Sequence, residues 1–280
     1  MTDFEDYLSH SLDGVNQGIV KEAALYALMN GGKRIRPKLL FAVLEAYHTN
    51  IEKGYDAACA VEMMHSYSLI HDDLPSMDND TIRRGKPTCH VKYGEGIAIL
   101  AGDALLTHSF QKACNATKEV HVNLKIVNDL AKAGGLDGMI YGQELDIQNE
   151  NRTDITADKL QEIHFYKTGK LITLPMVLAA HIAKKEDDVN LWREIGKRMG
   201  ILFQIQDDVF DVTKTTEELG KNANSDKDNN KITYVSLLGV EECNKLIASL
   251  YHEAVSMLDQ MVIDKEPILN IFNYLLNREK

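Results

Sequence analysis

Apolar residues recur every three or four positions along most of the chain, and this spacing predicts α-helices. The clearest stripe lies in the second half of the chain and comprises Leu191, Ile195, Met199, Leu202, Ile205 and Val209. A shorter stripe near the start comprises Phe4, Tyr7, Leu8 and Leu12. We find no hairpin dipeptide between alternating strands. The pattern therefore predicts an all-α protein.

Prolines and polar segments indicate where these helices break. The five prolines are expected at helix breaks, and they are Pro37, Pro75, Pro87, Pro175 and Pro267. Two polar segments, residues 148–156 and 213–233, are expected to be loops. The second is long enough to be either a functional lid or a disordered loop. Because no Ser-, Gly- or Pro-rich linker divides the chain, we expect one domain over residues 1–280.

Composition and charge narrow the possible partners and location. The net charge of −11 argues against a nucleic-acid partner, because such proteins usually present a basic face. The N-terminus has neither the basic nor the apolar region of a signal peptide. The longest apolar tract, residues 171–183, is too short for a transmembrane segment. The four cysteines form no CxxC pair, which favours reduced thiols and a cytoplasmic protein.

Two aspartate clusters each follow an apolar helical stretch. The first, "HDDLPSMDNDTIRRG", begins at His71, and its aspartates include Asp72, Asp73 and Asp78. Pro75 disfavours helical geometry at the preceding residue, so the chain could return Asp78 toward Asp72. The second, "DDVFD", contains Asp207, Asp208 and Asp211. Helical spacing places the carboxylates of this cluster on one face.

The clusters have a simple and a functional interpretation. One cluster alone would most simply be a solvated acidic helix end. Two clusters, each ending an apolar helix, favour a pair of Mg²⁺ sites that face each other across a cavity and hold a diphosphate. Mg²⁺ prefers hard oxygen ligands and keeps positions open for water and phosphate, while partly buried carboxylates without partners are costly.

Basic residues near these clusters could bind the diphosphates. "GGKRIRP" begins at Gly31 and supplies Lys33 and Arg36, although it is not a P-loop. Arg83 and Arg84 suit fork-like contacts with phosphate oxygens. Surface cations after a helix break are the alternative interpretation of "GGKRIRP". In "YKTGKL", Gly169 either kinks a helix and frees carbonyls or is a packing glycine.

The segments together resemble the trans-isoprenyl diphosphate synthase family, and within it the bacterial-type farnesyl diphosphate synthases. The matching strings are "GGKRIRP", "EMMHSYSLIHDDLPSMDNDTIRRGKPTCH", "GQELDI", "YKTGKL", "FQIQDDVFD" and "LGKNANSDKDNNKITY". The resemblance implies the isoprenoid synthase fold, with ten or more helices around a central cavity, and a homodimer. It also implies that an allylic diphosphate (dimethylallyl, then geranyl) is joined to isopentenyl diphosphate, giving (2E,6E)-farnesyl diphosphate and inorganic diphosphate.

The resemblance also assigns roles to individual residues. It implies three Mg²⁺ ions held by Asp72, Asp78 and Asp207, with support from Asp73, Asp208 and Asp211. The implied isopentenyl diphosphate binders are Lys33, Arg36, His65 and Arg84. At the allylic substrate the resemblance implies Arg83, Lys167, Thr168, Gln204, Lys221 and Lys231, of which Lys167, Thr168 and Gln204 are catalytic. One departure is Asn224, where the family usually has glycine; asparagine also tolerates a left-handed backbone.

Product length is expected to depend on the helix before Asp72. The family places a bulky residue five positions upstream, which is Tyr67 here, whereas helical spacing alone would favour Ser68. A geranylgeranyl or longer-chain synthase is therefore the alternative product assignment. A metal phosphohydrolase of the HD type would leave "DDVFD" and "GGKRIRP" unexplained. A catalytically silent partner subunit should lack one of the clusters, and a terpene cyclase should have a different second metal motif.

Overall fold

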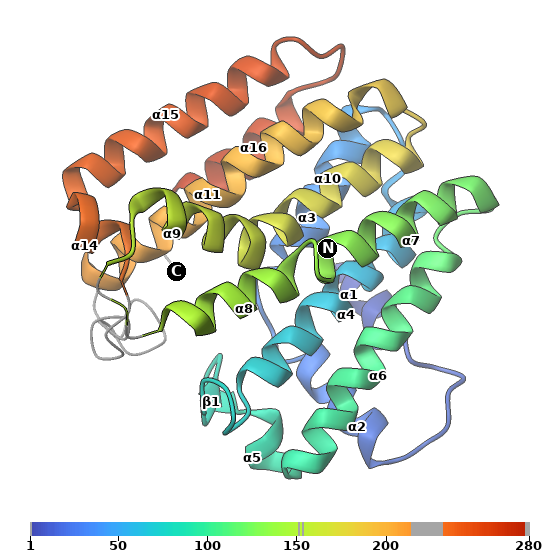
Figure 1. Ribbon diagram of the computed structural model, residues 1–280. Helices are drawn as coiled ribbons and strands as arrows, with labels where there is room; N and C mark the ends of the chain where they lie inside the picture. The colour runs from blue at the N-terminus through green and yellow to red at the C-terminus, as the bar shows by residue number, and fades with distance from the viewer. Residues whose placement is uncertain (1, 151, 153, 214–231, 278–280) are drawn as a thin grey trace.

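The computed structural model describes residues 2–150, 152, 154–213 and 232–277, which form helices and one short hairpin (Figure 1). In the first half the helices are α1 (Thr2–Ser9), α2 (Ile19–Leu28), α3 (Ile35–Ala46), η1 (Ile51–Gly54), α4 (Tyr55–Asp72), α5 (Cys89–Tyr93), α6 (Glu95–Cys114) and α7 (Val120–Gly134). In the second half they are α8 (Met139–Asn149), α9 (Ala157–His164), η2 (Phe165–Gly169), α10 (Lys170–Ile182), η3 (Glu186–Asp188), α11 (Val189–Thr213), α14 (Tyr234–Leu238), α15 (Val240–Leu258) and α16 (Glu266–Leu276). The all-α prediction is confirmed.

Helix α10 is central to the packing. Every residue from Leu171 to Ile182 is buried, and α10 contacts α3, α4, α7 and α11. A helix that is apolar on all sides is stable only when neighbours cover it on all sides. Pro175 lies inside α10, so its predicted position at a break is wrong. The ring removes one backbone donor, and packing on every side stabilises the helix despite that loss.

The predicted apolar stripes and polar segments can be compared with the helix bounds. The long stripe lies on α11, where Ile195, Met199 and Leu202 are fully buried. The polar segment expected at 148–156 begins inside α8, which continues to Asn149. Most of the segment expected at 213–233 lies outside the described residues. None of the described helices combines the length and apolarity needed to cross a lipid bilayer.

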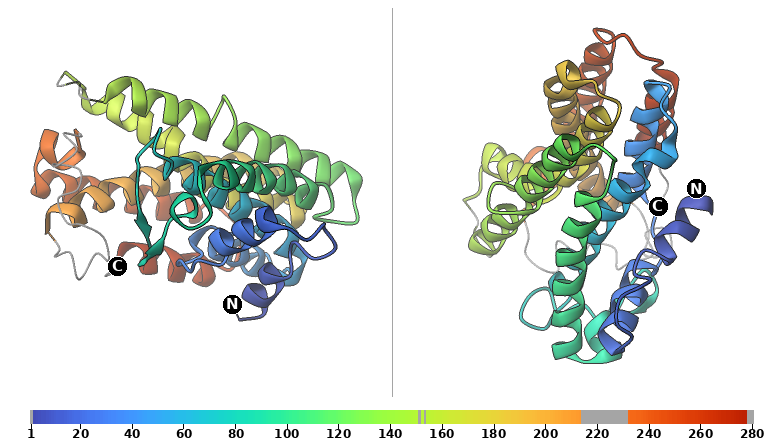
Figure 2. Two further views of the ribbon diagram at one scale, coloured as in Figure 1. Left: turned by 90° about the horizontal axis from the view of Figure 1, so that it is seen from below. Right: turned by 90° about the vertical axis from the view of Figure 1, so that its right-hand side faces the viewer.

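A two-stranded antiparallel hairpin interrupts the helical order between α4 and α5, although the sequence has no hairpin dipeptide there. It pairs β1 (Ile82–Arg83) with β2 (Lys86–Pro87). The two turn residues, Arg84 and Gly85, have φ of 53° and 74°, and a type I′ turn requires positive φ at both. Two residue pairs are too few to produce a strand pattern in the sequence. Figure 2 shows the hairpin beside the N-terminal helices.

Candidate active site

Helix α4 ends at the first aspartate cluster, and the chain then returns on itself. The backbone N–H of Asp78 donates to the carbonyl of Asp72 at 2.8 Å, which confirms the predicted return of the chain. Burial raises the pKa of Asp72 to about 6 against the opposing charge of Lys167, and Asp78 raises it further. Among the described residues no hydrogen bond or ion pair engages either carboxylate. A cation placed here would relieve this unfavourable charge.

The hairpin separates the two neighbouring arginines because Arg83 ends strand β1, whereas Arg84 is the first residue of the turn and has a positive φ. Arg83 pairs with the buried carboxylate of Asp73, with Nε and Nη2 at 2.7 and 2.6 Å from Oδ1. Arg84 points the other way, and its Nη1 donates to the carbonyl of Gly31 at 2.5 Å. Two consecutive arginines therefore contact two different parts of the site. Asp73 forms an ion pair with Arg83, whereas Asp72 beside it forms none with the described residues.

Positive charge gathers where Arg84 meets the start of α3. Burial lowers the pKa of Arg36 to about 10, and Arg84 lowers it further against the pull of Glu62. Its Nε is buried without a hydrogen-bond partner in the described part of the chain. Neighbouring Arg34 is instead paired with Glu5 and Glu62, at 2.8 and 3.2 Å. Arg36 and Arg84 thus form a cationic cluster that lacks a full set of acidic partners, as an anion site requires.

His65 lies half-buried at this cluster but is not a fixed cation. Burial lowers its pKa well below the usual value, and Arg36, Arg84 and other arginines lower it further. The lowered pKa favours a neutral imidazole at His65. A neutral imidazole can still donate one hydrogen bond to a phosphate oxygen.

Lys167 and Thr168 lie in η2, a single π-helical turn between α9 and α10. Such turns interrupt the regular hydrogen-bond ladder and are frequent at functional sites. A side chain at Gly142 would collide with the backbone of Lys167, and a Cβ at Gly200 would lie 2.6 Å from the Cα of Gly169. Gly169 thus lies in a distorted turn and is tightly packed, whereas the freeing of carbonyls stays a prediction.

Lys167 lies between the aspartates at the end of α4 and the cavity beside α11. Its Nζ pairs with Asp146 on α8 at 2.5 Å. Burial alone would lower the pKa of Lys167, but Asp146, Asp72 and Asp78 raise it. Lys167 also lines a cavity of about 140 Å³ together with Thr168, Gln204 and Asp208. The cavity therefore brings together predicted residues from η2 and α11.

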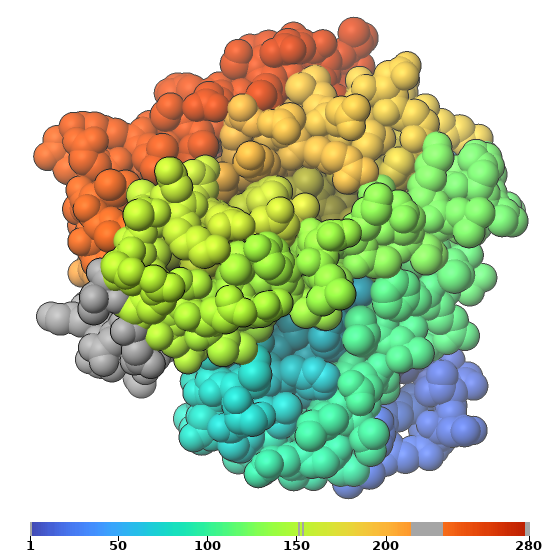
Figure 3. Space-filling view, viewed as in Figure 1, coloured from blue at the N-terminus to red at the C-terminus, as the bar shows by residue number. Residues whose placement is uncertain are grey.

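The second aspartate cluster lies at the end of α11, and its members differ. Asp207 is half-buried, while Asp208 and Asp211 are buried. Oδ2 of Asp208 accepts the backbone N–H of Tyr234 at 2.8 Å, so this carboxylate helps to hold the start of α14. Asp207 follows Gln204 by three residues and shares its face of the helix. Figure 3 shows the neighbouring surface, where α8 and α9 lie beside the segment after α4.

The described residues contain no group of three or more His, Cys, Asp or Glu side chains close enough to enclose a metal ion. Mg²⁺ is usually bound by one or two carboxylates, with waters and substrate phosphates completing the octahedron. The unengaged carboxylates of Asp72 and Asp78 and the helix-end position of Asp207 fit that mode. Lys221, Lys231 and Asn224 lie outside the described residues.

Tyr67 and Ser68 occupy different surroundings on α4. Tyr67 is 5% exposed, packs edge-on against His71 and has a buried hydroxyl without a hydrogen-bond partner in the described chain. Ser68 is also buried, and its Oγ donates to the carbonyl of His65 at 2.9 Å. Asp146 is a site residue that we did not assign from the sequence. It lies in "GQELDI", but no local pattern indicates its pairing with Lys167.

Comparisons with known proteins agree with this arrangement. The family model "Polyprenyl synthetase" matches residues 17–271. The chain is 43% identical to a farnesyl diphosphate synthase of Micrococcus luteus, covering 94% of this chain and 91% of the relative. It is 38% identical to a chloroplastic geranylgeranyl pyrophosphate synthase of Catharanthus roseus, covering 99% and 82%.

A solved structure of a Helicobacter pylori geranyltransferase complexed with magnesium and isoprenyl diphosphate superposes with a TM-score of 0.85. It is 36% identical, and the match covers 99% of this chain and 93% of that one. The isoprenoid synthase fold expected from the sequence is confirmed by this likeness.

Gly32→Ala should weaken diphosphate binding, because a Cβ at Gly32 would lie 2.6 Å from Nη1 of Arg84 and φ there is +112°. We expect about tenfold weaker binding of inorganic diphosphate, equivalent to about 1.4 kcal/mol, by titration calorimetry. Gly14→Ala is the matched control, since Gly14 also has positive φ but no atom within 4 Å of the added Cβ. Equal affinities for Gly32→Ala and the parent would contradict the placement of Arg84.

Proposed function

Because the chain belongs to the polyprenyl synthetase family, we propose that it condenses dimethylallyl and then geranyl diphosphate with isopentenyl diphosphate to give (2E,6E)-farnesyl diphosphate. The observation that carries this proposal is the division of charge at the site. Within the part of the chain that the structure describes, Asp72 and Asp78 present carboxylates without partners, and Arg36 and Arg84 present cations without enough acidic partners. One diphosphate must leave and the other must stay, so the two subsites need different chemistry.

The retained diphosphate of isopentenyl diphosphate is assigned to Lys33, Arg36, His65 and Arg84. Arginine forks suit phosphate oxygens, so Lys33, Arg36 and Arg84 provide binding charge without a metal, and His65 provides a hydrogen-bond donor. The leaving diphosphate is assigned to Arg83, Lys167, Lys221 and Lys231. The ion pairs of Arg83 with Asp73 and of Lys167 with Asp146 hold both cations in place before substrate arrives, which is the preorganisation that charge stabilisation requires.

Mg²⁺ fits Asp72, Asp78 and Asp207, and when bound there it would supply Lewis-acid stabilisation of charge on the leaving diphosphate. The reaction breaks the allylic C–O bond, forms a C–C bond to the isopentenyl double bond and releases a proton. The carbonyl near Thr168 and the amide oxygen of Gln204 stabilise the allylic cation by their dipoles. The departed diphosphate, held by Arg83 and Lys167, accepts the proton.

A geranylgeranyl product is the second candidate, because relatives with both products match at similar identity. The bulk and burial of Tyr67 support the shorter product, since we propose that the growing tail runs along α4 and that this ring limits it. Burying a hydroxyl without a partner is costly, which fits a residue retained for its size at this position.

We also propose a cytoplasmic homodimer built from one synthase domain over residues 1–280. The continuous core from Phe4 to Leu275 supports one domain. All four cysteines are free thiols, as expected for a reducing compartment. Ile99 and Leu100 on α6 are 44% and 52% exposed, and exposed apolar side chains side by side favour a protein interface.

Purified protein given dimethylallyl and isopentenyl diphosphates with Mg²⁺ should release inorganic diphosphate and form a C15 product, measured by mass spectrometry of the dephosphorylated alcohol. A chelator should abolish both outputs, and restored Mg²⁺ should recover them. Asp72→Asn should lower kcat at least about a hundredfold, as loss of preorganised charge stabilisation does in other enzymes. Diphosphate release without a new carbon–carbon bond would favour a phosphohydrolase instead.

Tyr67→Ala should lengthen the product to C20 or beyond, because it removes the ring that limits the tail. Tyr67→Phe is the matched control: it keeps the ring, removes only the hydroxyl and should leave the product at C15. Chromatography of the dephosphorylated products distinguishes these outcomes. If Tyr67→Ala keeps the parent profile while Ser68→Phe shortens it, Ser68 is the length-limiting position.

The parent should sediment at twice its chain mass of 31.4 kDa, and Leu100→Asp should reduce it to a monomer by placing a charge in the apolar contact. Val262→Asp is the control, because Val262 is fully exposed and lies outside α6. A parent that sediments as a monomer at micromolar concentration would exclude the dimer.

A further inference from the structure

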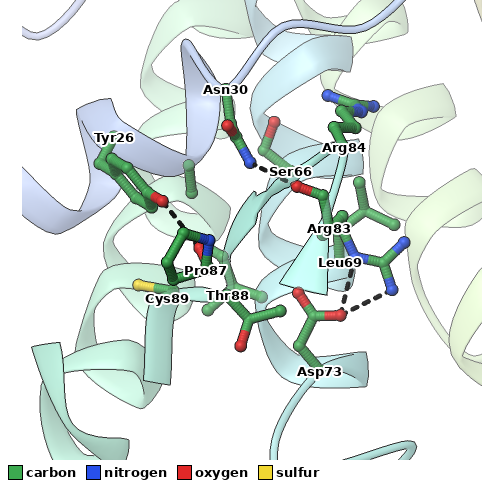
Figure 4. A pocket seen from close by; sticks show the side chains of 12 residues that line it. Tyr26, Asn30, Ser66, Leu69, Asp73, Arg83, Arg84, Pro87, Thr88 and Cys89 are labelled. Atoms are coloured by element: carbon green, nitrogen blue, oxygen red, sulfur yellow. Dashed lines mark hydrogen bonds and ion pairs between the residues drawn. The ribbon is translucent and has the colours of Figure 1, made fainter. Parts of the chain in front are cut away.

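The hairpin that carries Arg83 and Arg84 is fastened to the turn between α2 and α3 by side-chain hydrogen bonds. Nδ2 of Asn30 donates to the carbonyl of Arg83 at 3.2 Å, and Nη1 of Arg84 donates to the carbonyl of Gly31 at 2.5 Å. Farther along, the hydroxyl of Tyr26 donates to the carbonyl of Pro87 at 2.7 Å. Figure 4 shows the Asn30 and Tyr26 contacts reaching the hairpin from one side.

The hairpin needs this external support. It contains two residue pairs, and isolated hairpins are at best marginally stable in water even when longer. Its position relative to the rest of the protein is therefore set by what it contacts. Asn30 and Gly31 are adjacent residues of one turn, and each shares a hydrogen bond with the hairpin. The same turn leads into Lys33 and Arg36.

The Asn30–Arg83 and Arg84–Gly31 hydrogen bonds should respond differently to bound substrate. The guanidinium of Arg84 is assigned to the retained diphosphate, so phosphate oxygens compete with the carbonyl of Gly31 for its N–H groups. The Asn30 bond engages a backbone carbonyl and no charged group. Diphosphate therefore does not compete for it, and it still fastens the hairpin when the site is filled.

Asn30 is buried, and its surroundings favour this single arrangement. It is 9% exposed, and Oδ1 has no hydrogen-bond partner in the described chain. The amide must keep Nδ2 toward Arg83, since two carbonyl-type oxygens would repel. Beside it lies a cavity of about 20 Å³ that is also lined by Ser66 and Cys89, enough for one water that could bond Oδ1.

We propose that Asn30 is a positioning residue that fixes the hairpin carrying Arg83 and Arg84 relative to the Lys33–Arg36 segment, and so sets the separation of the two diphosphate subsites. This inference rests on the proposed function. Arg83 faces the leaving diphosphate and Arg84 the retained one, so a shift of this hairpin changes both subsites together. Asn30 itself touches neither substrate.

Asn30→Leu, of similar size but without the donor, should raise KM for both isopentenyl and dimethylallyl diphosphate about fivefold to tenfold, the effect of losing one ordinary hydrogen bond. kcat and product length should stay within twofold of the parent. Asn30→Ala should give the same split, and it provides a second test if the leucine variant folds poorly. Ser66→Ala is the matched control, because it lines the same cavity and makes no hydrogen bond to the hairpin; its KM values should equal those of the parent.

Amide hydrogen exchange gives a readout that does not need turnover. The backbone amides of residues 81–88 should exchange faster than in the parent in both Asn30 variants. Their exchange rates should be unchanged in Ser66→Ala. Parental KM values in the Asn30 variants, a fall in kcat alone, or an equal shift in Ser66→Ala would overturn the proposal. A parent that forms no product would refute the proposed function; the positioning role would then stand or fall on whether exchange of residues 81–88 responds to Asn30.

Discussion

The site depends on acidic and basic side chains that lie close together without neutralising one another. Some of them are paired: Asp73 holds Arg83, and Glu5 and Glu62 hold Arg34. These pairs leave Asp72 and Asp78 on one side and Arg36 and Arg84 on the other. Two carboxylates about 4 Å apart repel by about 4 kcal/mol at an effective dielectric of 20, so such an arrangement persists only where the surrounding fold is rigid.

That rigidity comes from close backbone packing behind the site. Helix α10 is buried along its length, and η2 is held between Gly142 of α8 and Gly200 of α11, where no larger side chain fits without a shift. Lys167 therefore projects from a fixed turn toward the aspartates at the end of α4. On the opposite side, the hairpin directs Arg83 to Asp73 and its turn directs Arg84 to the carbonyl of Gly31. The fold supplies fixed charges, and the substrates and metal would complete their neutralisation.

Sequence reasoning predicts the parts of this arrangement that arise from local patterns. Periodicity gives the stripe of α11, and Pro75 gives the return of the chain that brings Asp78 to Asp72. It fails where a distant residue decides the outcome. The Arg84–Gly85 turn lacks the usual Asn-Gly signal, and Pro175 is tolerated because four helices cover α10. The pKa of His65 is lowered by burial and by arginines of two segments, residues 34–36 and the hairpin. The pairing of Asp146 with Lys167 and of Asp208 with Tyr234 likewise has no local signal.

The central claim is that Asp72 and Asp207 hold metal ions over one leaving diphosphate. The most direct test is anomalous diffraction from crystals grown with Mn²⁺ and a non-ionisable thiolo analogue of dimethylallyl diphosphate. The account predicts Mn²⁺ ions bound by Asp72 and by Asp207 that share oxygens of the same diphosphate. Metal ions at the two aspartates in separate spaces, with no diphosphate between them, would contradict it.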